Sequence, residues 1–214
     1  MKRGVLIVLE GIDGAGKTTH AKLLTEWLRE EGYIVSLTKE PTSGEIGSLI
    51  RKQLQRRVFH PATLALLFAA DRLEHAESEL KPRIEAGEVI VSDRYVESSI
   101  CYQAAEGVDV EWIEDINKWA LNADLTILLD VDAQTAMERM GSKFKDKFEE
   151  ESFLERVRKI YLERAKEKGY LVIDATPPVE DVQMKIRRIV ASFMKNCENF
   201  IFKGLKVCSG DEEV

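Results

Sequence analysis

One short segment near the start of the sequence holds residue types whose spacing predicts phosphate chemistry. Residues 11–18 read Gly-Ile-Asp-Gly-Ala-Gly-Lys-Thr and fit the pattern G-x-x-x-x-G-K-S/T. Glycines let the backbone curl until successive N–H groups point at phosphate oxygens, and the following helix N-terminus adds partial positive charge. Lys17 supplies a mobile cation, and the Thr18 hydroxyl is suited to ligate Mg²⁺. The predicted contacts with a nucleoside triphosphate are Gly11, Ile12, Asp13, Gly14, Ala15, Gly16, Lys17, Thr18 and Thr19.

A second group of chemically active residues follows a predicted strand. The apolar run Val89–Ser92 is followed directly by Asp93 and Arg94. If the sheet is parallel, both residues lie at its carboxyl edge beside the phosphate loop, where Asp93 is suited to hold the hydration shell of Mg²⁺ and Arg94 to meet an anion. An ordinary helix cap or salt bridge is the alternative for such a pair. The phosphate loop leaves the acceptor open, because GTPases, motor ATPases and small-molecule kinases share it.

The elements that must position these residues can be predicted from the apolar pattern. Five short runs rich in Val, Ile and Leu alternate with helical patterns, in the rhythm of βαβ units. The runs are Val5–Leu9, Ile34–Leu37, Val89–Val91, Leu125–Val131 and Tyr170–Ile173. Because they are apolar on both faces, they predict an α/β fold in which helices cover both sides of a parallel sheet.

Periodic apolar residues predict helices between the strands. The predicted stretches are Lys17–Glu31, Pro61–Ala86, Trp112–Leu121 and Phe153–Ala165. The first is expected to end at Gly32. Within the second, Leu64–Ala70 is apolar all round, so this segment is expected to be deeply buried or partly covered by a partner subunit.

The composition predicts one compact domain. The 214 residues are 44% hydrophobic, and the chain is shorter than the roughly 250–300 residues at which single cores usually split. A net charge of −7 argues against nucleic acid as a partner. No apolar run reaches the roughly 18–20 residues that cross a bilayer, so no membrane contact is expected and a cytoplasmic location is predicted. Residues 1–195 are predicted to form the domain, and residues 196–214 a partly ordered tail.

Further motifs join the phosphate loop in a characteristic order. They are Glu40-Pro41, Phe68-Ala-Ala-Asp-Arg72, Asp93-Arg-Tyr-x-x-Ser-Ser-x-x-Tyr-Gln103, and Asp146-Lys-Phe-Glu149 followed by Arg156-Val-Arg158-x-x-Tyr161. With these motifs the chain resembles the thymidylate kinase family from about Val5 to Val190. The resemblance implies the Mg²⁺-dependent reaction ATP + dTMP → ADP + dTDP, in dTTP synthesis. It also implies a P-loop kinase fold with a five-stranded parallel sheet, a short mobile lid at about residues 140–150, and a homodimer.

The resemblance assigns several positions to the binding of dTMP. Phe68 falls where the family stacks a ring on thymine, although alone it would be interpreted as a core residue. Arg72, four residues later on the same helix face, is expected to donate to a base carbonyl. Asp13 matches the acidic residue aimed at the sugar 3′-hydroxyl. The matched substrate positions are Asp13, Glu40, Pro41, Arg51, Phe68, Arg72, Arg94, Ser98, Ser99, Tyr102 and Gln103.

The resemblance also assigns positions around the phosphates and the adenine. Arg51 and Arg94 match residues at the acceptor phosphate, where planar guanidinium groups suit bidentate binding. Arg51 equally fits an ordinary solvated helix face. Arg139 aligns with a residue that flanks the adenine, and Ala175 and Thr176 align with backbone contacts on its other side.

The phosphate loop departs from one branch of the family, in which a loop Arg assists phosphoryl transfer. Here residues 12–15 are Ile-Asp-Gly-Ala and hold no cation. The other branch places basic residues in the lid, and Lys143, Lys145 and Lys147 fit that branch with lysine in place of Arg. A solvated lysine-rich loop is the alternative. The predicted catalytic residues are Lys17, Asp93, Arg94, Lys143, Lys145 and Lys147, with Thr18 and, through water, Asp93 at the metal.

Three other functions remain open at this point. A kinase for another nucleoside monophosphate would share most of these residues. A deoxynucleoside kinase would need a carboxylate base for its hydroxyl acceptor, whereas an acceptor phosphate is already ionised near pH 7 and would use the two arginines. A regulatory P-loop ATPase is the alternative outside kinases, and no Asn/Thr-Lys-x-Asp guanine-reading element is found.

Overall fold

The computed structural model describes residues 3–56, 59–141 and 147–205, the side chains of 147–148 and 197–205 excepted. The described part is an α/β fold, as predicted, with one sheet of five parallel strands in the order β2-β3-β1-β4-β5. The strands are β1 Val5–Glu10, β2 Val35–Lys39, β3 Val89–Asp93, β4 Leu125–Asp130 and β5 Leu171–Asp174. Each contains most of the apolar run that predicted it.

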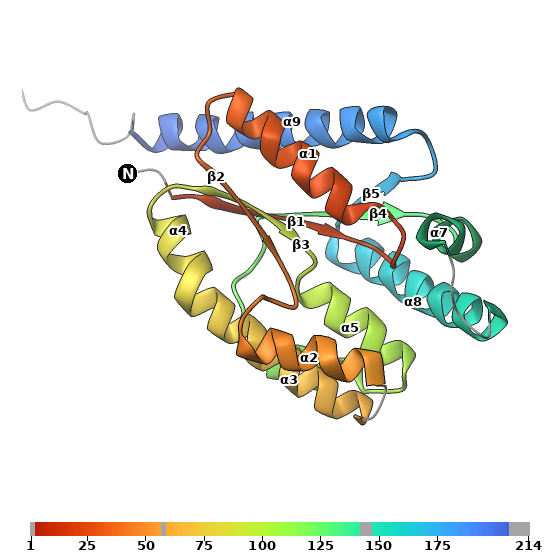
Figure 1. Cartoon of the computed structure of the whole chain (residues 1–214). Helices are drawn as coiled ribbons and strands as arrows, with labels where there is room; N and C mark the ends of the chain where they lie inside the picture. Colours follow the sequence, from red (N-terminus) through yellow and green to blue (C-terminus); the bar gives the residue numbers. More distant parts are fainter. Residues whose placement is uncertain (1–2, 57–58, 142–146, 206–214) are drawn as a thin grey trace, which may run out of the picture.

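Helices cover both faces of this sheet (Figure 1). On one face lie α1 (Lys17–Glu30) and α9 (Val179–Leu205), which pack against each other. The other face is covered by α3 Pro61–His75, the π-helical turn Ala76–Leu80, α4 Lys81–Glu85, α5 Val96–Ala105 and α8 Lys147–Lys168. Three shorter helices complete the described part: α2 Glu45–Arg56 on α3, α6 Val110–Ile116 on α5, and α7 Ala133–Met140 on α8.

Strand β1 shows why a continuous apolar run suits the centre of the sheet. Ile7 and Leu9 belong to the core under α1, whereas Leu6 and Val8 belong to a second cluster with Leu80 beside α4. All of them are buried. Each fully buried aliphatic side chain contributes about 1.5–3 kcal/mol, so the two layers hold the strand firmly on both faces.

The prediction that every strand is buried on both faces is wrong for the two edge strands, β2 and β5, and Leu37 in β2 is 40% exposed. Leu171 and Val172 are 43% and 47% exposed. β5 lies at one edge of the sheet beyond β4, β2 lies at the other edge beyond β3, and an edge strand has a neighbouring strand on one side only. An apolar run predicts a strand but does not reveal its place in the sheet.

The predicted helices are largely confirmed. α1 ends at Glu30, and Gly32 has the left-handed φ of 89° that favours glycine after a helix. The stretch Pro61–Ala86 is helical through α3, the π turn and α4, and Phe153–Ala165 lies inside α8. The prediction for Trp112–Leu121 is wrong in length, because α6 ends at Ile116 and the next residues form turns.

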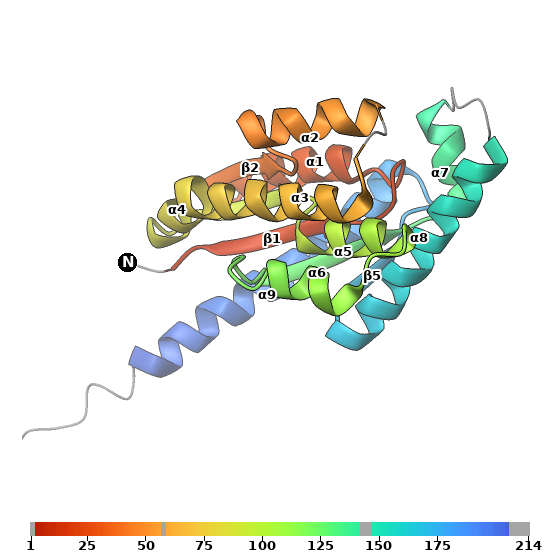
Figure 2. The ribbon, with the colours of Figure 1, turned by 90° about the horizontal axis from the view of Figure 1, so that it is seen from below.

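The carboxyl-terminal boundary predicted at residue 195 falls inside α9, which continues as a helix to Leu205 and projects away from the rest of the molecule (Figure 2). The predicted lid includes residues 142–146, which lie outside the described residues. Among the described residues, no helix is long and apolar enough to cross a membrane.

Candidate active site

The phosphate loop connects central strand β1 to α1 and owes its shape to three glycines. Gly11, Gly14 and Gly16 have positive φ angles of 144°, 82° and 91°. A Cβ at Gly14 would also overlap the carbonyl of Ala136, so a larger residue is excluded there on two grounds. The side chains of Ile12 and Ala15 lie in the core and anchor the loop. These two residues are thus placed to meet ATP only through their backbone.

Lys17 lies within the curve of this loop, and its Nζ donates to the Ile12 carbonyl at 2.7 Å. Burial, with a smaller effect of the positive charge on Arg94, lowers the pKa of the Lys17 ammonium to about 7. The ammonium therefore sits where added negative charge would restore its ordinary protonation. A phosphate held by the loop supplies that charge.

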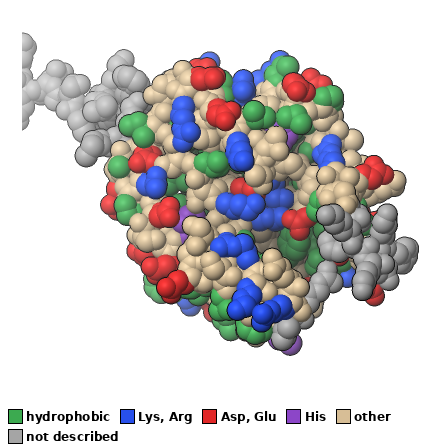
Figure 3. Space-filling model, in the orientation of Figure 1, with side chains coloured by type: hydrophobic (Ala, Val, Ile, Leu, Met, Phe, Trp, Pro, Cys, Tyr) green, Lys and Arg blue, Asp and Glu red, His purple; other side chains and the backbone are tan. Residues whose placement is uncertain are grey.

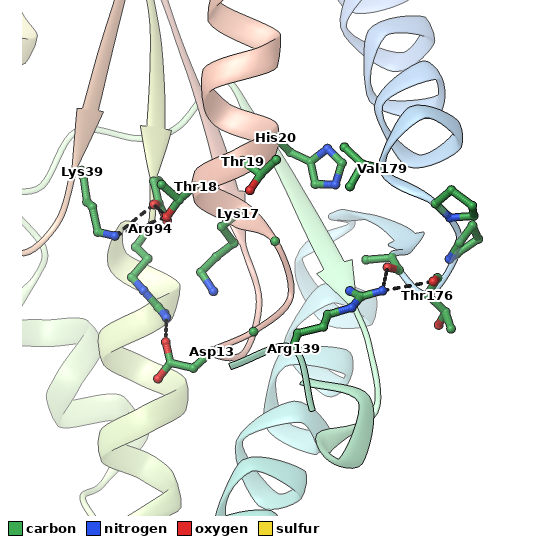
Figure 4. Close-up of a pocket in the computed structure, with 16 residues that line it drawn as sticks. Asp13, Lys17, Thr18, Thr19, His20, Lys39, Arg94, Arg139, Thr176 and Val179 are labelled. Atoms are coloured by element: carbon green, nitrogen blue, oxygen red, sulfur yellow. Dashed lines mark hydrogen bonds and ion pairs between the residues drawn. The ribbon is translucent and has the colours of Figure 1, made fainter. Parts of the chain in front are cut away.

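A cavity of about 770 Å³ opens along the loop (Figure 4). Arg139 reaches it from α7, and its Nη2 donates to the carbonyls of Ala175 and Thr176 at 2.9 and 3.0 Å. The structure thus brings the three predicted adenine-side residues together, and Thr176 lies across the cavity from Lys39 in Figure 4. On the face in Figure 3, Lys and Arg side chains gather near the middle of the molecule.

A second cavity, of about 170 Å³, lies beside the first. It is lined by Asp13, Glu40, Pro41, Leu54, Phe68, Arg72, Arg94, Tyr95, Ser98, Tyr102 and Gln103. Most of the predicted substrate residues are in this set, including Phe68 and Arg72 from one face of α3. Asp13 and Arg94 line both cavities, so they form the wall at which the two meet.

Arg94 is held at this wall by an unusual backbone conformation and by contacts of its guanidinium. Its φ is 77°, the only positive value among the described non-glycine residues. The guanidinium forms an ion pair with Asp13, donates from Nη1 to Ser98 Oγ at 2.9 Å, and lies 5.3 Å from the ring centroid of Tyr102. Burial alone would raise the pKa of Asp13, but the charges of Arg94 and Lys17 lower it, so the carboxylate is ionised near neutral pH.

Asp93 and Thr18 fit a divalent cation. Thr18 Oγ1 donates to Asp93 Oδ2 at 2.5 Å, and Asp93 Oδ1 is buried without a hydrogen-bond partner in the described part of the chain. An unpartnered buried carboxylate oxygen beside a hydroxyl is the kind of donor set that Mg²⁺ takes, with water completing its coordination. The sequence prediction for these two residues is compatible with this geometry.

Arg72 and its partners form a buried framework behind the second cavity. The guanidinium donates to Glu40 Oε2 at 2.8 Å and to Ser99 Oγ at 3.0 Å, and it also binds Asn117 Oδ1 and the Tyr95 carbonyl. These contacts occupy four of its five N–H groups. Only one N–H is left for the base carbonyl that the sequence predicts as a partner, and Glu40 and Ser99 have their side chains engaged with Arg72.

Arg51 is bonded to its own segment of the protein, and its predicted role at the acceptor phosphate stays a prediction. Its Nη1 donates to the carbonyls of Pro41, at 3.1 Å, and Thr42, and its Nη2 to Ser48 Oγ at 3.0 Å. It lines a third cavity, of about 440 Å³, which reaches Thr18 and Asp93. This cavity shares Pro41 with the cavity of Phe68, and Thr18 and Asp93 with the cavity of the phosphate loop.

Glu10, the last residue of β1, lies in the site although no sequence motif predicted it. Its buried carboxylate accepts hydrogen bonds from Tyr95 N and Ser98 Oγ, both at 2.7 Å, and from Tyr161 Oη at 2.8 Å. Burial raises the pKa of Glu10 even though these donors oppose it. A charged residue ending an apolar strand, directly before the phosphate loop, is the signal that could have found it.

Lys39, at the end of β2, was not predicted by a motif either; its Nζ lies 3.2 Å from Asp93 Oδ2. Nothing in the apolar pattern of β2 points to it. The predicted lid residues Lys143 and Lys145 lie outside the described residues, as does the side chain of Lys147, whose backbone begins α8.

Comparison with known proteins identifies the family. The sequence model of the family described as "Thymidylate kinase" matches residues 9–186. A protein named "Probable thymidylate kinase" from Methanothermobacter thermautotrophicus is 46% identical over 202 residues, which cover 91% of this chain and 98% of that protein. Another of the same name, from Thermococcus gammatolerans, is 42% identical over 200 residues, covering 87% of this chain and 96% of that protein. The resemblance seen in the motifs is therefore confirmed: the chain belongs to the thymidylate kinase family.

Proposed function

We propose that this protein transfers the γ-phosphoryl group of ATP to the phosphate of dTMP, giving ADP and dTDP in dTTP synthesis. The observation that carries the proposal is the shared wall formed by Asp13 and Arg94. One cavity contains the phosphate loop, and the other contains Phe68, an aromatic ring suited to stack on a base. Two phosphates approaching from these cavities would meet at Arg94.

The chemistry requires positioning and charge rather than a base. An oxygen of the acceptor phosphate bonds to the γ-phosphorus while the bond from that phosphorus to the β–γ bridging oxygen breaks, and this oxygen leaves with ADP. Lys17 and Arg94 hold the negative charge that spreads over the moving group. Asp13 orients Arg94 through their ion pair. By the family's pattern, the Asp13 carboxylate also accepts a hydrogen bond from the 3′-hydroxyl of the sugar.

We infer that Thr18 and Asp93 hold Mg²⁺ during this reaction, because Asp93 Oδ1 is buried and unpartnered among the described residues. The ion, when bound, supplies positive charge to the β- and γ-phosphate oxygens. Asp93 is well placed for this role because β3 ends there, beside the phosphate loop that follows its neighbour β1.

The experiment that tests the proposed function is coupled ADP release with a panel of acceptors. We expect strong dependence on dTMP, weaker dependence on dUMP and UMP, and none on thymidine. Lys17→Ala should keep less than about a tenth of wild-type kcat, since it removes a cation from the phosphate loop. Arg188→Ala, on the exposed face of α9, is the matched loss of charge elsewhere and should not change kcat. Slow ADP release without any acceptor would instead identify a P-loop ATPase.

We also propose that the protein acts as a homodimer in the cytoplasm. Leu66, in the segment of α3 that is apolar all round, is 51% exposed in the single chain, and Leu73 on the same helix is also exposed. A second copy packed on this surface would remove both from water. Sedimentation at micromolar concentration should give about twice 24.3 kDa, whereas a fully active monomer would contradict the dimer.

A further inference from the structure

Lys39 is the last residue of β2, and its place follows from the sheet register. Lys39 and Asp93 are paired across β2 and β3, and Glu40 N donates to the Asp93 carbonyl at 3.2 Å. Because the strands are parallel, the carboxyl end of β2 reaches the same edge as the phosphate loop. The edge strand β2 thus places a lysine at the site, in addition to the residues that come from α1 and from the end of β3.

The Lys39 ammonium already touches the two residues that fit the metal. Its Nζ lies 3.2 Å from Asp93 Oδ2 and 3.4 Å from Thr18 Oγ1 (Figure 4). The side chain lines both the cavity of the phosphate loop and the third cavity next to it. It is 54% exposed, so no packing holds the ammonium on Asp93.

The other cations that line the phosphate cavity are held by the protein. Lys17 donates to Ile12, Arg94 is paired with Asp13 and bonded to Ser98, and Arg139 binds two carbonyls beyond the loop. Within the described residues, the Lys39 ammonium contacts only the side chains of Asp93 and Thr18, and its own side chain is 54% exposed. Because the Lys39 side chain is half exposed, water and salt screen its attraction to Asp93, and the ammonium can exchange this carboxylate for a group of higher negative charge.

We propose that Lys39 is a catalytic residue whose ammonium moves from Asp93 to an oxygen of the transferring phosphoryl group. The inference rests on the proposed function and deepens it. Several negative charges arrive when a triphosphate enters the loop, and they outcompete one carboxylate that the metal also requires. The lysine sits beside Thr18 and Asp93, where the γ-phosphate end of the nucleotide is expected, and it supplies a charge that the loop spacer Ile12-Asp13-Gly14-Ala15 lacks.

The test compares Lys39→Ala and Lys39→Arg with Lys159→Ala, a control lysine on α8 that is 77% exposed and lies 3.9 Å from Glu163. Steady-state assays give kcat and the KM values for ATP and dTMP. Calorimetry in EDTA gives the affinities for ATP and ADP without metal and without turnover. Thermal unfolding checks that each variant folds.

We expect Lys39→Ala to lower kcat at least about tenfold while the KM for dTMP stays within about threefold. In EDTA, Lys39→Ala should lower the affinity for ATP at least about threefold more than the affinity for ADP, because only ATP has the γ-phosphate. Lys39→Arg should retain more kcat than the alanine variant, and Lys159→Ala should match wild type.

Two results would overturn the role of Lys39. One is a kcat for Lys39→Ala within about threefold of wild type together with an unchanged ATP-to-ADP affinity ratio. The other is a joint loss of thermal stability, kcat and affinity for both nucleotides, which would make Lys39 a structural residue. Failure of the proposed function can be told apart from failure of the role of Lys39. In that case the wild-type protein would release no ADP in response to dTMP, and the calorimetric comparison of ATP with ADP would still test Lys39.

Discussion

Replacement of Arg94 should separate activity from stability, because this residue combines a functional side chain with a strained backbone. Two charge-assisted hydrogen bonds to phosphate are worth about 1.5–3 kcal/mol each, so their loss amounts to about 3–6 kcal/mol. Arg94→Ala and Arg94→Gly should therefore both lower kcat/KM by about 10²–10⁴. The two variants lose the same contacts with Asp13, Ser98 and Tyr102.

The variants should differ in stability because of the φ of 77° at this position. A left-handed backbone destabilises an L-residue by about 1–2 kcal/mol, and glycine avoids this strain. Glycine in turn lowers the stability of the folded state by about 0.5–1 kcal/mol, because its unfolded chain has more conformational entropy to lose. We expect Arg94→Gly to be more stable than Arg94→Ala by about 0.5–1 kcal/mol. For a protein of this size that is about 1–4 °C in Tm.

Calorimetric melting of wild type and both variants measures this difference, and coupled ADP release measures the activity. Arg188→Ala serves as the control for loss of one guanidinium from the surface. A higher Tm for Arg94→Ala than for Arg94→Gly would refute the backbone strain at this position. A kcat/KM above about a tenth of the wild-type value in either variant would refute the role of Arg94 at the phosphates.

Three further predictions concern the base, the buried carboxylate and the lid. Phe68→Ala should raise the KM for dTMP and leave that for ATP unchanged, because stacking is worth about 1–3 kcal/mol; equal rises in both would indicate damage to α3. Glu10→Gln should gain stability relative to wild type as pH rises above about 4.5 in urea unfolding, because the raised pKa of Glu10 means that the folded wild type binds the proton more tightly and loses stability as pH rises; a difference independent of pH would contradict this. Single alanine substitutions at Lys143, Lys145 and Lys147 should be unequal, with one lowering kcat at least about tenfold; values all within about threefold of wild type would leave the three as solvated charges.

Much of the fold could be predicted because its elements have local signals. β1 and β3 are apolar on both faces and are buried on both, and α1 ends where Gly32 allows a left-handed turn. Strand β5 could be predicted to exist but not to be exposed. Its exposure depends on its place beside β4 at the edge of the sheet, which no property of its own residues encodes.

Arg72 shows the same limit within the site. Its spacing from Phe68 correctly predicts that both line one cavity, because i and i+4 share a helix face. The spacing does not reveal that Glu40, Asn117 and Ser99, from three other segments, occupy most of its donors. The guanidinium of an arginine in a motif can bind a ligand, other protein groups or both. Which of these it binds depends on the side chains that the fold places around it.

The sequence by itself determined the phosphate loop, because eight contiguous residues contain the glycines that set its backbone and the lysine and threonine that it presents. The tertiary structure decided what those residues face. Thr18 meets Asp93 from 75 residues away and Asp13 meets Arg94 from 81, through the pairing of β1 with β3. The same sheet order brings Lys39 from β2 to Asp93. Backbone conformation follows from neighbouring residue types, whereas the meeting of distant charges follows from which strands lie side by side, and burial of the whole sheet selects that order.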